Sequence, residues 1–362
     1  MQEWSEHLND SGGEFNAESK ASRETVVPFC ANLGDSRFDR ATTFESARAM
    51  ADRVFYQGCE QHQLGQFDVA LRSFQQAYAL YQSVQHELGE GKALGNLGLT
   101  YYSLKNYAKA IKCSQQSIAL AQKHQDRRNL IKLTSTLGNA YRHLNEHGHA
   151  IKYQRQSLAI AQEIEDRRGE MAALNNLGLA YKALGDYAAT IQYEKQSLEI
   201  AREIQDDQVE EQILKNLGNA CYALGDYGNA IAYYQQRLAL ARETSDRRAE
   251  EQILRNLANA CYAAGHYERT IEYSRQRLTV ARETQDRRGE EQALGSMGVA
   301  YDAMGDYARA INYYEQRLAI ARKMQDYRLE EQVLGSLKFA YYALGDFAKV
   351  AECSRQRQAL PF

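Results

Sequence analysis

The sequence predicts an all-α fold, a solenoid of eight antiparallel helix pairs. One segment recurs every 40 residues, without insertion, from about residue 47 to the end of the chain. Only two prolines occur in 362 residues, Pro28 and Pro361, so long helices are not interrupted. Apolar residues within each repeat recur at steps of three and four, the periodicity of amphipathic helices. Strands are therefore not expected.

The repeat that begins near residue 207 shows how each unit is expected to fold. Its two apolar stripes are Leu214, Leu217, Cys221 and Leu224, followed by Ala230, Ile231, Tyr234, Leu238 and Ala241. Gly225 suits the left-handed conformation at the end of the first helix, and Asp226 suits the N-cap of the second. The helices that open later repeats are expected to be capped by Asp246, Asp286 and Asp326.

Two regions follow from this pattern. Residues 1–44 match no repeat, contain Gly12-Gly13 and Pro28, and carry an excess of acidic side chains, which predicts a largely disordered acidic tail. Eight repeats fill residues 45–362, with starts near 47, 87, 127, 167, 207, 247, 287 and 327. A single pair cannot bury its apolar stripe, so neighbouring pairs are expected to stack into one continuous core.

Composition argues against several classes of function. The formal charge is only −3, from 44 basic and 47 acidic residues, so no strong field draws the chain to nucleic acid or to a lipid surface. No stretch approaches the ~20 apolar residues that cross a bilayer, and the first residues do not resemble a signal peptide. Six cysteines without C-x-x-C spacing suit a reducing compartment, and Cys221 and Cys261 are expected to be buried. We expect a soluble, cytoplasmic protein.

No catalytic or cofactor motif occurs, so we expect neither an enzyme nor a bound cofactor. The strongest metal candidate is the cluster of His143, His147 and His149, but it has no fourth ligand and no recognised spacing. We interpret the cluster as a degenerate surface turn and predict no metal site. The Asp-Arg-Arg triplets at 126, 166, 246 and 286 are interpreted as a solvated edge.

The repeat resembles the tetratricopeptide repeat (TPR). The resemblance is carried by Leu217-Gly-Asn-Ala followed by Tyr222, by Leu224-Gly-Asp-Tyr, and by Ala230-Ile231. The usual TPR period is 34 residues with a proline after the second helix, whereas the period here is 40. Units of this length containing Gln236-Arg237-Leu238 are similar to the LGN/Pins adaptors and to bacterial signalling arrays. The resemblance implies a right-handed superhelix whose first helices line a concave groove for a peptide or partner helix.

The resemblance also implies which residues would face that groove. Aligned on the first helices, the asparagine positions are Asn96, Asn176, Asn216 and Asn256, with Asn139, Asn219 and Asn259 three residues further on. Their amides can donate to and accept from a peptide backbone. Tyr222 and Tyr262 would lie one turn beyond, as rigid contact side chains, with Lys215 and Arg255 adding positive charge.

One position of the second helix changes along the chain. It is Ser117, Ser157 and Ser197 in earlier repeats, then Arg237, Arg277, Arg317 and Arg357. In LGN/Pins repeats the matching arginine faces the groove and meets ligand carboxylates, which implies a basic half-groove and an acidic ligand. The alternative is that these arginines pair with glutamates of the next repeat, such as Glu251 or Glu291.

We therefore predict a non-catalytic adaptor or scaffold whose groove binds an extended, acidic segment of another protein. A second hypothesis is a regulatory protein in which a bound peptide changes the superhelical pitch and so controls an effector. The acidic tail is a third consideration, because it could occupy a basic groove and compete with the ligand.

Overall fold

The chain forms an array of α-helices. A computed structural model describes the backbone of residues 40–361 and the side chains from residue 45, and all sixteen regular elements in this part are helices. It divides into two compact units, one ending at Leu184 and the other beginning at Gly185. The first unit contains α1 (Arg40–Gln63), α2 (Phe67–Ser83), α3 (Glu87–Ser103), α4 (Tyr107–Lys123), α5 (Arg127–His143), α6 (His147–Glu163) and α7 (Arg167–Leu184). The second contains α8 (Tyr187–Glu203), α9 (Asp207–Ala223), α10 (Tyr227–Glu243), α11 (Arg247–Ala263), α12 (Tyr267–Glu283), α13 (Arg287–Ala303), α14 (Tyr307–Met324), α15 (Tyr327–Ala343) and α16 (Phe347–Gln358).

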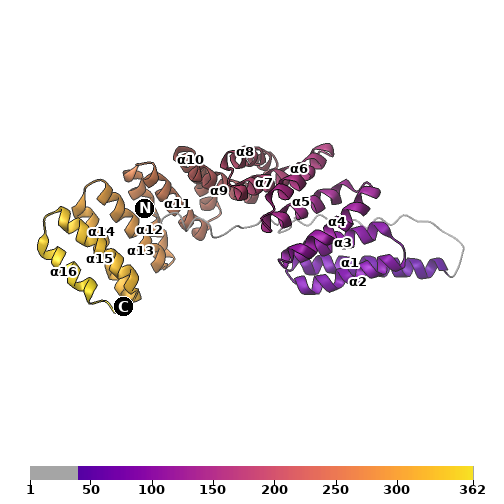
Figure 1. Ribbon diagram of the computed structural model, residues 1–362, viewed down its shortest axis with the longest axis horizontal. Coiled ribbons are helices and arrows are strands. Elements are labelled where there is room, and N and C mark those ends of the chain that lie inside the picture. Colours follow the sequence, from indigo (N-terminus) through magenta and orange to yellow (C-terminus); the bar gives the residue numbers. More distant parts are fainter. Residues whose placement is uncertain (1–39, 362) are drawn as a thin grey trace. The chain divides into compact units, whose positions relative to one another are not determined.

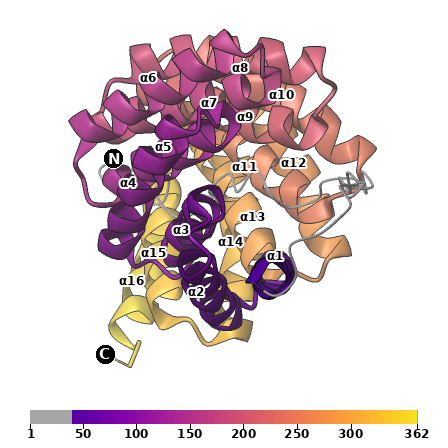
Figure 2. The same ribbon diagram turned by 90° about the vertical axis from the view of Figure 1, so that its right-hand side faces the viewer.

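These helices confirm the predicted all-α array of eight antiparallel pairs. Within each unit every helix packs against the one before and the one after it, as Figure 1 shows for α13 to α16. The odd-numbered first helices of the first unit also contact one another in succession, from α1 to α7. Figure 2 views α1 nearly along its axis, beside α2 and α3. The predicted tail lies outside the described residues up to residue 39, and α1 begins at Arg40, before the repeat start expected near 47.

The core of each unit lies between first and second helices. In the second unit Ile213, Leu214 and Leu217 of α9 are fully buried, and Tyr234 of α10 is 1% exposed. Each buried aliphatic side chain contributes roughly 1.5–3 kcal/mol to folding. Cys221 and Cys261 are buried, as predicted, and burial raises the pKa of each thiol to about 11. They are therefore core side chains rather than reactive thiols.

A glycine on the first helix makes room for the large tyrosine on the second. A Cβ atom at Gly218 would lie 2.4 Å from the Tyr234 ring. Gly298 has the same relation to Tyr314, at 2.5 Å. The close approach of the two helices therefore depends on the missing side chain.

The turns follow the predicted chemistry with one exception. Gly225 has φ 83°, and Asp226 accepts a hydrogen bond from the Asn229 amide at 3.2 Å, as an N-cap does. Asp246 and Asp326 cap their helices in the same way. The prediction for Asp286 was wrong, because its side chain makes no cap hydrogen bond, although it precedes α13.

Candidate peptide-binding surface

The arginine column joins the two helices of each pair. Arg237 and Arg277 are only 5% and 4% exposed, and the remaining two members are less deeply buried. Each guanidinium contacts the glutamate 26 residues earlier, on the first helix of its own pair. The pairs are Arg237 Nε with Glu211 Oε1 at 3.0 Å, Arg277 Nε with Glu251 Oε1 at 2.5 Å, Arg317 Nε with Glu291 Oε2 at 2.8 Å and Arg357 Nη2 with Glu331 Oε1 at 2.8 Å. The alternative interpretation was therefore right about pairing with glutamate and wrong about the repeat that supplies it.

The serines of the earlier repeats occupy the same place with different partners. The Ser117 hydroxyl donates to the Gly91 carbonyl at 2.6 Å, and the Ser157 hydroxyl to the Ile131 carbonyl at 3.2 Å. The change from serine to arginine thus coincides with the appearance of glutamate on the facing helix. Sequence reasoning missed this signal, although arginine and glutamate recur together at a spacing of 26 residues.

Most of the first asparagine column lies between helices. Asn176, Asn216 and Asn256 are 6%, 3% and 7% exposed. The Asn176 amide donates to Ser135 Oγ at 3.1 Å, and the Asn216 amide donates to Glu194 Oε1 at 2.9 Å. Asn96 is less buried and donates to the backbone carbonyl of Lys92, one turn earlier. Asn176 and Asn216 thus form hydrogen bonds to a neighbouring helix, whereas Asn96 bonds within its own helix.

The second column is half-buried, and two of its members have intramolecular partners. The Asn139 carbonyl oxygen accepts from the Gln154 amide at 3.1 Å. The Asn219 carbonyl oxygen accepts from the Tyr234 hydroxyl at 2.7 Å. Within the described chain, the Asn259 side chain makes no hydrogen bond, so its amide is available to a ligand.

The α11 face gathers three such groups. We use this name for Arg255, Asn259 and Tyr262, which are four and three residues apart and so lie on one side of α11 over about 10 Å. Arg255 and Asn259 are half-buried, and Tyr262 is 40% exposed. Arg255 has no ion-pair partner among the described residues, whereas Arg277 beside it is neutralised by Glu251.

The electrostatics of this region favour an anion. Burial lowers the pKa of Arg277, Glu251 opposes that effect, and the positive charge of Arg255 adds to it. The positive charges of Arg255 and Arg277 therefore repel each other, while Glu251 and Asp286 favour the charged form of Arg277. Burial raises the pKa of Tyr262, so its hydroxyl stays protonated and can donate a hydrogen bond. The face thus offers a planar cation, an amide and a phenol to one ligand.

The corresponding face of α9 carries Lys215, Asn219 and Tyr222, all half-buried. The Tyr222 ring packs against Tyr227 with centroids 5.4 Å apart, and burial raises its pKa. Since Asn219 already bonds to Tyr234, this face offers less free hydrogen-bonding capacity than α11.

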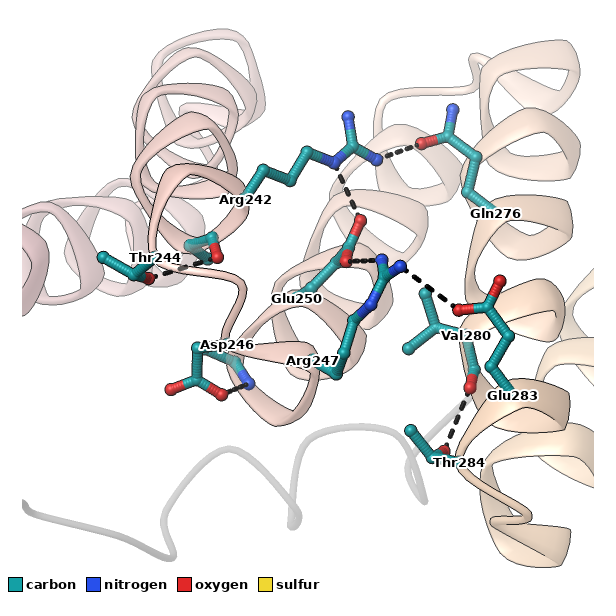
Figure 3. Close-up of polar contacts among 11 residues, drawn as sticks. Arg242, Thr244, Asp246, Arg247, Glu250, Gln276, Val280, Glu283 and Thr284 are labelled. Carbon is teal, nitrogen blue, oxygen red and sulfur yellow. Dashed lines mark hydrogen bonds and ion pairs between the residues drawn. The ribbon is translucent and has the colours of Figure 1, made fainter.

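The Asp-Arg-Arg edge connects one helix pair to the next. The Glu250 carboxylate accepts from Arg242 Nε at 2.8 Å and from Arg247 Nη1 at 2.7 Å, and Arg247 also contacts Glu283 (Figure 3). Burial raises the pKa of Glu250, but the two arginines outweigh it, so the pKa lies below its usual value. The arginine at position 242 has equivalents that contact the opening helix of the next pair, namely Arg202 with Glu210, Arg282 with Glu290 and Arg322 with Glu330. This edge is exposed to solvent, and it also carries ion pairs that join one helix pair to the next.

Two histidines of the predicted cluster contact different neighbouring side chains. His143 stacks on Tyr107 with centroids 4.8 Å apart, and its Nε2 lies 3.2 Å from the Tyr102 hydroxyl. His149 contacts Glu146 at 3.0 Å. Among the residues that the structure describes, no three metal-binding side chains gather, and no helix is long and apolar enough to cross a bilayer.

Several solved structures share the fold at low identity. A signal transduction ATPase with numerous domains, with a tetratricopeptide repeat sensor, from Pyrococcus horikoshii aligns over 88% of this chain and 48% of its own, with 19% identity and a TM-score of 0.58. This chain thus spans about half the length of that protein. Apo RapI aligns over 76% and 99%, with 14% identity and a TM-score of 0.55. The apo quorum sensor NprR from B. thuringiensis aligns over 86% and 87%, with 14% identity and a TM-score of 0.50.

Comparison with curated proteins finds no match. The family model described as tetratricopeptide repeat matches residues 58–123, 128–203, 209–283 and 252–323, which is more than half of the sequence. These matches include α11 and the arginine–glutamate pairs of α9 to α12. The chain therefore belongs to the tetratricopeptide repeat family.

Proposed function

We propose that the chain is a non-catalytic scaffold that binds an extended, acidic segment of another protein, with the α11 face at the centre of the binding surface. Tetratricopeptide repeats generally serve as protein-binding modules. The observation that carries the acidic preference is Arg255, a half-buried guanidinium without an ion-pair partner among the described residues. A ligand carboxylate would supply that partner through two parallel hydrogen bonds.

Neighbouring side chains would hold the backbone of the same segment. Asn259 can donate to a peptide carbonyl and accept from a peptide N–H, irrespective of the ligand side chains. Tyr262 would add rigid apolar contact and a hydrogen bond. In this proposal the paired arginines stabilise the helix pairs and do not bind the ligand carboxylate, because each already forms an ion pair with a glutamate. These arginines are Arg237, Arg277 and Arg317.

The test is a selection followed by a binding measurement. A random dodecapeptide library displayed on phage is selected on the immobilised full-length protein, and the enriched peptides are synthesised with a fluorescent label. We expect enrichment of aspartate and glutamate. A charge-assisted hydrogen bond contributes about 1.5–3 kcal/mol, so Arg255→Gln should weaken binding at least about 10-fold in fluorescence anisotropy.

Arg275→Gln is the matched control, because Arg275 is an exposed arginine on the adjacent α12. Like Arg255→Gln, this substitution removes one positive charge from the second unit. It leaves the α11 face unchanged. Equal affinities of the two variants would contradict the assignment of this face. Reversal of Arg237 or Arg277 to glutamate is a poorer test, because it would place two carboxylates together in a buried site and unfold the pair.

A regulatory role is the second candidate, and the division of the chain favours it. One compact unit ends at Leu184 and the other begins at Gly185. A ligand that binds one conformation of the chain better than another would shift the population toward it. Small-angle scattering of the full chain with and without a selected peptide measures this. A change in radius of gyration supports a peptide-gated regulator, and an unchanged profile supports a passive scaffold.

A further inference from the structure

Three exposed aromatic side chains gather where α15 ends and α16 begins. Phe339, Tyr342 and Phe347 are 57%, 64% and 65% exposed. Phe339 and Tyr342 are three residues apart and so share one side of α15, and the Tyr342 and Phe347 rings meet edge to face with centroids 5.9 Å apart. The Tyr307 ring lies 6.3 Å from that of Phe339 and packs on the buried core. We call Phe339, Tyr342 and Phe347 the α15 patch.

The equivalent side chains of earlier repeats are less accessible. The residue at the place of Phe347 is half-buried in every earlier repeat, because the following first helix packs on it. Tyr107 stacks on His143 of α5 in this way, and Tyr307 contacts Phe339 of α15. Within the described chain, more than half of each side chain of the α15 patch stays accessible. The patch is therefore an apolar surface open to a ligand.

The α15 patch continues the line of the α11 face. Because the repeat is 40 residues long, Phe339 has on α15 the place that Asn259 has on α11, and Tyr342 has the place of Tyr262. From α11 to α15 each helix of the second unit packs on the one before it (Figure 1). On α13, between the two, the same place holds Val299, which packs against the core. A segment that crosses these first helices thus passes from polar, cationic side chains to apolar ones.

The area of the patch suits one side chain rather than a second copy of the chain. A large aromatic side chain offers about 150–250 Å², so three rings with these exposures leave about 300–450 Å² accessible. A stable dimer buries about 800 Å² on each partner. Leu344 is also exposed, but so are its equivalents Leu184 and Leu224, so its exposure is not specific to this place. The α15 patch alone is therefore too small to hold two copies together.

We infer that the α15 patch binds one large apolar side chain, of the size of leucine, phenylalanine or tryptophan, from the same segment that the α11 face binds. This inference rests on the proposed function, because it concerns the same ligand. Burying such a side chain against rigid aromatic rings favours binding through the apolar area removed from water. The ligand class becomes an extended segment with an acidic residue and an apolar anchor, rather than a uniformly acidic one.

The repeat also sets the spacing of the two residues in the ligand. Helices α11 and α13 contact each other directly, and packed helices lie about 8–10 Å apart. Two such steps lead from α11 to α15, and an extended chain advances about 3.3 Å per residue. The acidic residue at Arg255 and the apolar anchor at Phe339 should therefore be about five or six residues apart.

The phage selection on the full chain provides the first readout. We expect the enriched peptides to contain a large apolar residue about five or six positions from the acidic one. Selection on Phe339→Asn should retain the acidic residue and lose the apolar one. Enrichment of acidic peptides without the apolar residue on the wild-type protein would overturn this inference and leave the proposed function standing. Failure to enrich acidic peptides would instead overturn the proposed function, and this inference with it.

A double-mutant cycle separates ligand contact from a structural effect. Asparagine is the residue that α9 and α11 have at the place of Phe339, so Phe339→Asn should keep the helix and the melting temperature. It should weaken binding of a selected peptide about 10-fold in fluorescence anisotropy and leave unchanged the affinity for a peptide whose apolar residue is alanine. Phe347→Ser, on the other helix of the patch, should give the same pattern. An equal loss of affinity for both peptides would show a structural role and overturn the inference.

Leu224→Asn is the matched control, because Leu224 is an exposed apolar residue of the second unit, 54% accessible, at the end of α9. It should bind both peptides as the wild type does. Sedimentation velocity of the full chain tests the other occupant of the patch. We expect the same sedimentation coefficient for the wild type and Phe339→Asn at the concentrations of the binding assay. A wild-type dimer that Phe339→Asn dissociates would show that a second copy covers the patch and would overturn the inference.

Discussion

The four arginine–glutamate pairs include one buried pair and one exposed pair. Both have the same spacing of 26 residues in the sequence, so their contributions to stability can be compared directly. Arg277 and Glu251 have side chains 5% and 21% exposed, whereas Arg357 and Glu331 are 39% and 43% exposed. We consider the substitutions Glu251→Gln and Glu331→Gln. Both preserve shape and remove one negative charge from a first helix.

The expected magnitudes differ because the arginines differ in burial. Loss of one partner from a buried pair costs about 3–5 kcal/mol, since the remaining charge is left in a site of low polarity. Glu251 is partly accessible to water, and a glutamine could still accept from Arg277, as Gln292 does at 2.7 Å. We therefore expect a loss of about 2–3 kcal/mol for Glu251→Gln. An exposed pair contributes at most about 1 kcal/mol, and Glu331→Gln should lose no more than that.

The assay is urea unfolding of the full chain followed by circular dichroism, with hydrogen exchange to localise the change. Repeat proteins can unfold in parts, so exchange of the α11 and α12 amides is the local readout. Glu251→Gln should lower the unfolding midpoint and speed exchange in these two helices, and Glu331→Gln should do neither there. Equal losses in the two variants would refute the claim that burial determines the contribution of this column.

Four further predictions concern single residues. Glu250→Gln should destabilise the chain at pH 7, and because the folded pKa of Glu250 is depressed, the difference from wild type should disappear as the pH falls below the usual glutamate range in urea titrations. Asp226→Ala should cost about 1 kcal/mol through loss of its cap bond, while Asp286→Ala, which loses no such bond, should stay within about 0.5 kcal/mol by the same measurement. Gly218→Ala should cost about 1–3 kcal/mol in calorimetry, because the new methyl group meets the facing tyrosine ring. Asp302→Asn should stabilise the chain at pH 7 and have no effect below about pH 4, since a raised folded pKa makes the ionised form the unfavourable one.

Local sequence determines most of this fold, so most of it was predictable. The 40-residue period, the leucine stripes and the Gly225-Asp226 turn fixed the number and order of helices, because each acts within a few residues. The cap at Asp286 was not predictable from residue type alone. An aspartate there accepts a cap bond only if its side chain adopts the required rotamer, and that depends on the surrounding packing.

The binding surface was less accessible to sequence reasoning. Asn256 and Asn259 lie three residues apart on one helix, but only the first is buried, and this difference depends on where the neighbouring helices pack. Periodicity predicts which residues share one face of a helix, but not which part of that face packs against the next repeat. The pairing of Arg277 with Glu251 was predictable in principle, because both residue types appear in the same repeats at constant spacing.

Site-specific photo-cross-linking tests whether the peptide binds at the α11 face. p-Benzoylphenylalanine is introduced at Tyr262 of the α11 face and, as a control, at Arg275 on α12, and each protein is irradiated with a labelled peptide from the phage selection. We expect a cross-link at position 262 that excess unlabelled peptide suppresses, and none at position 275. A cross-link at position 275 without one at position 262 would show that the ligand binds elsewhere and would contradict its placement on the α11 face.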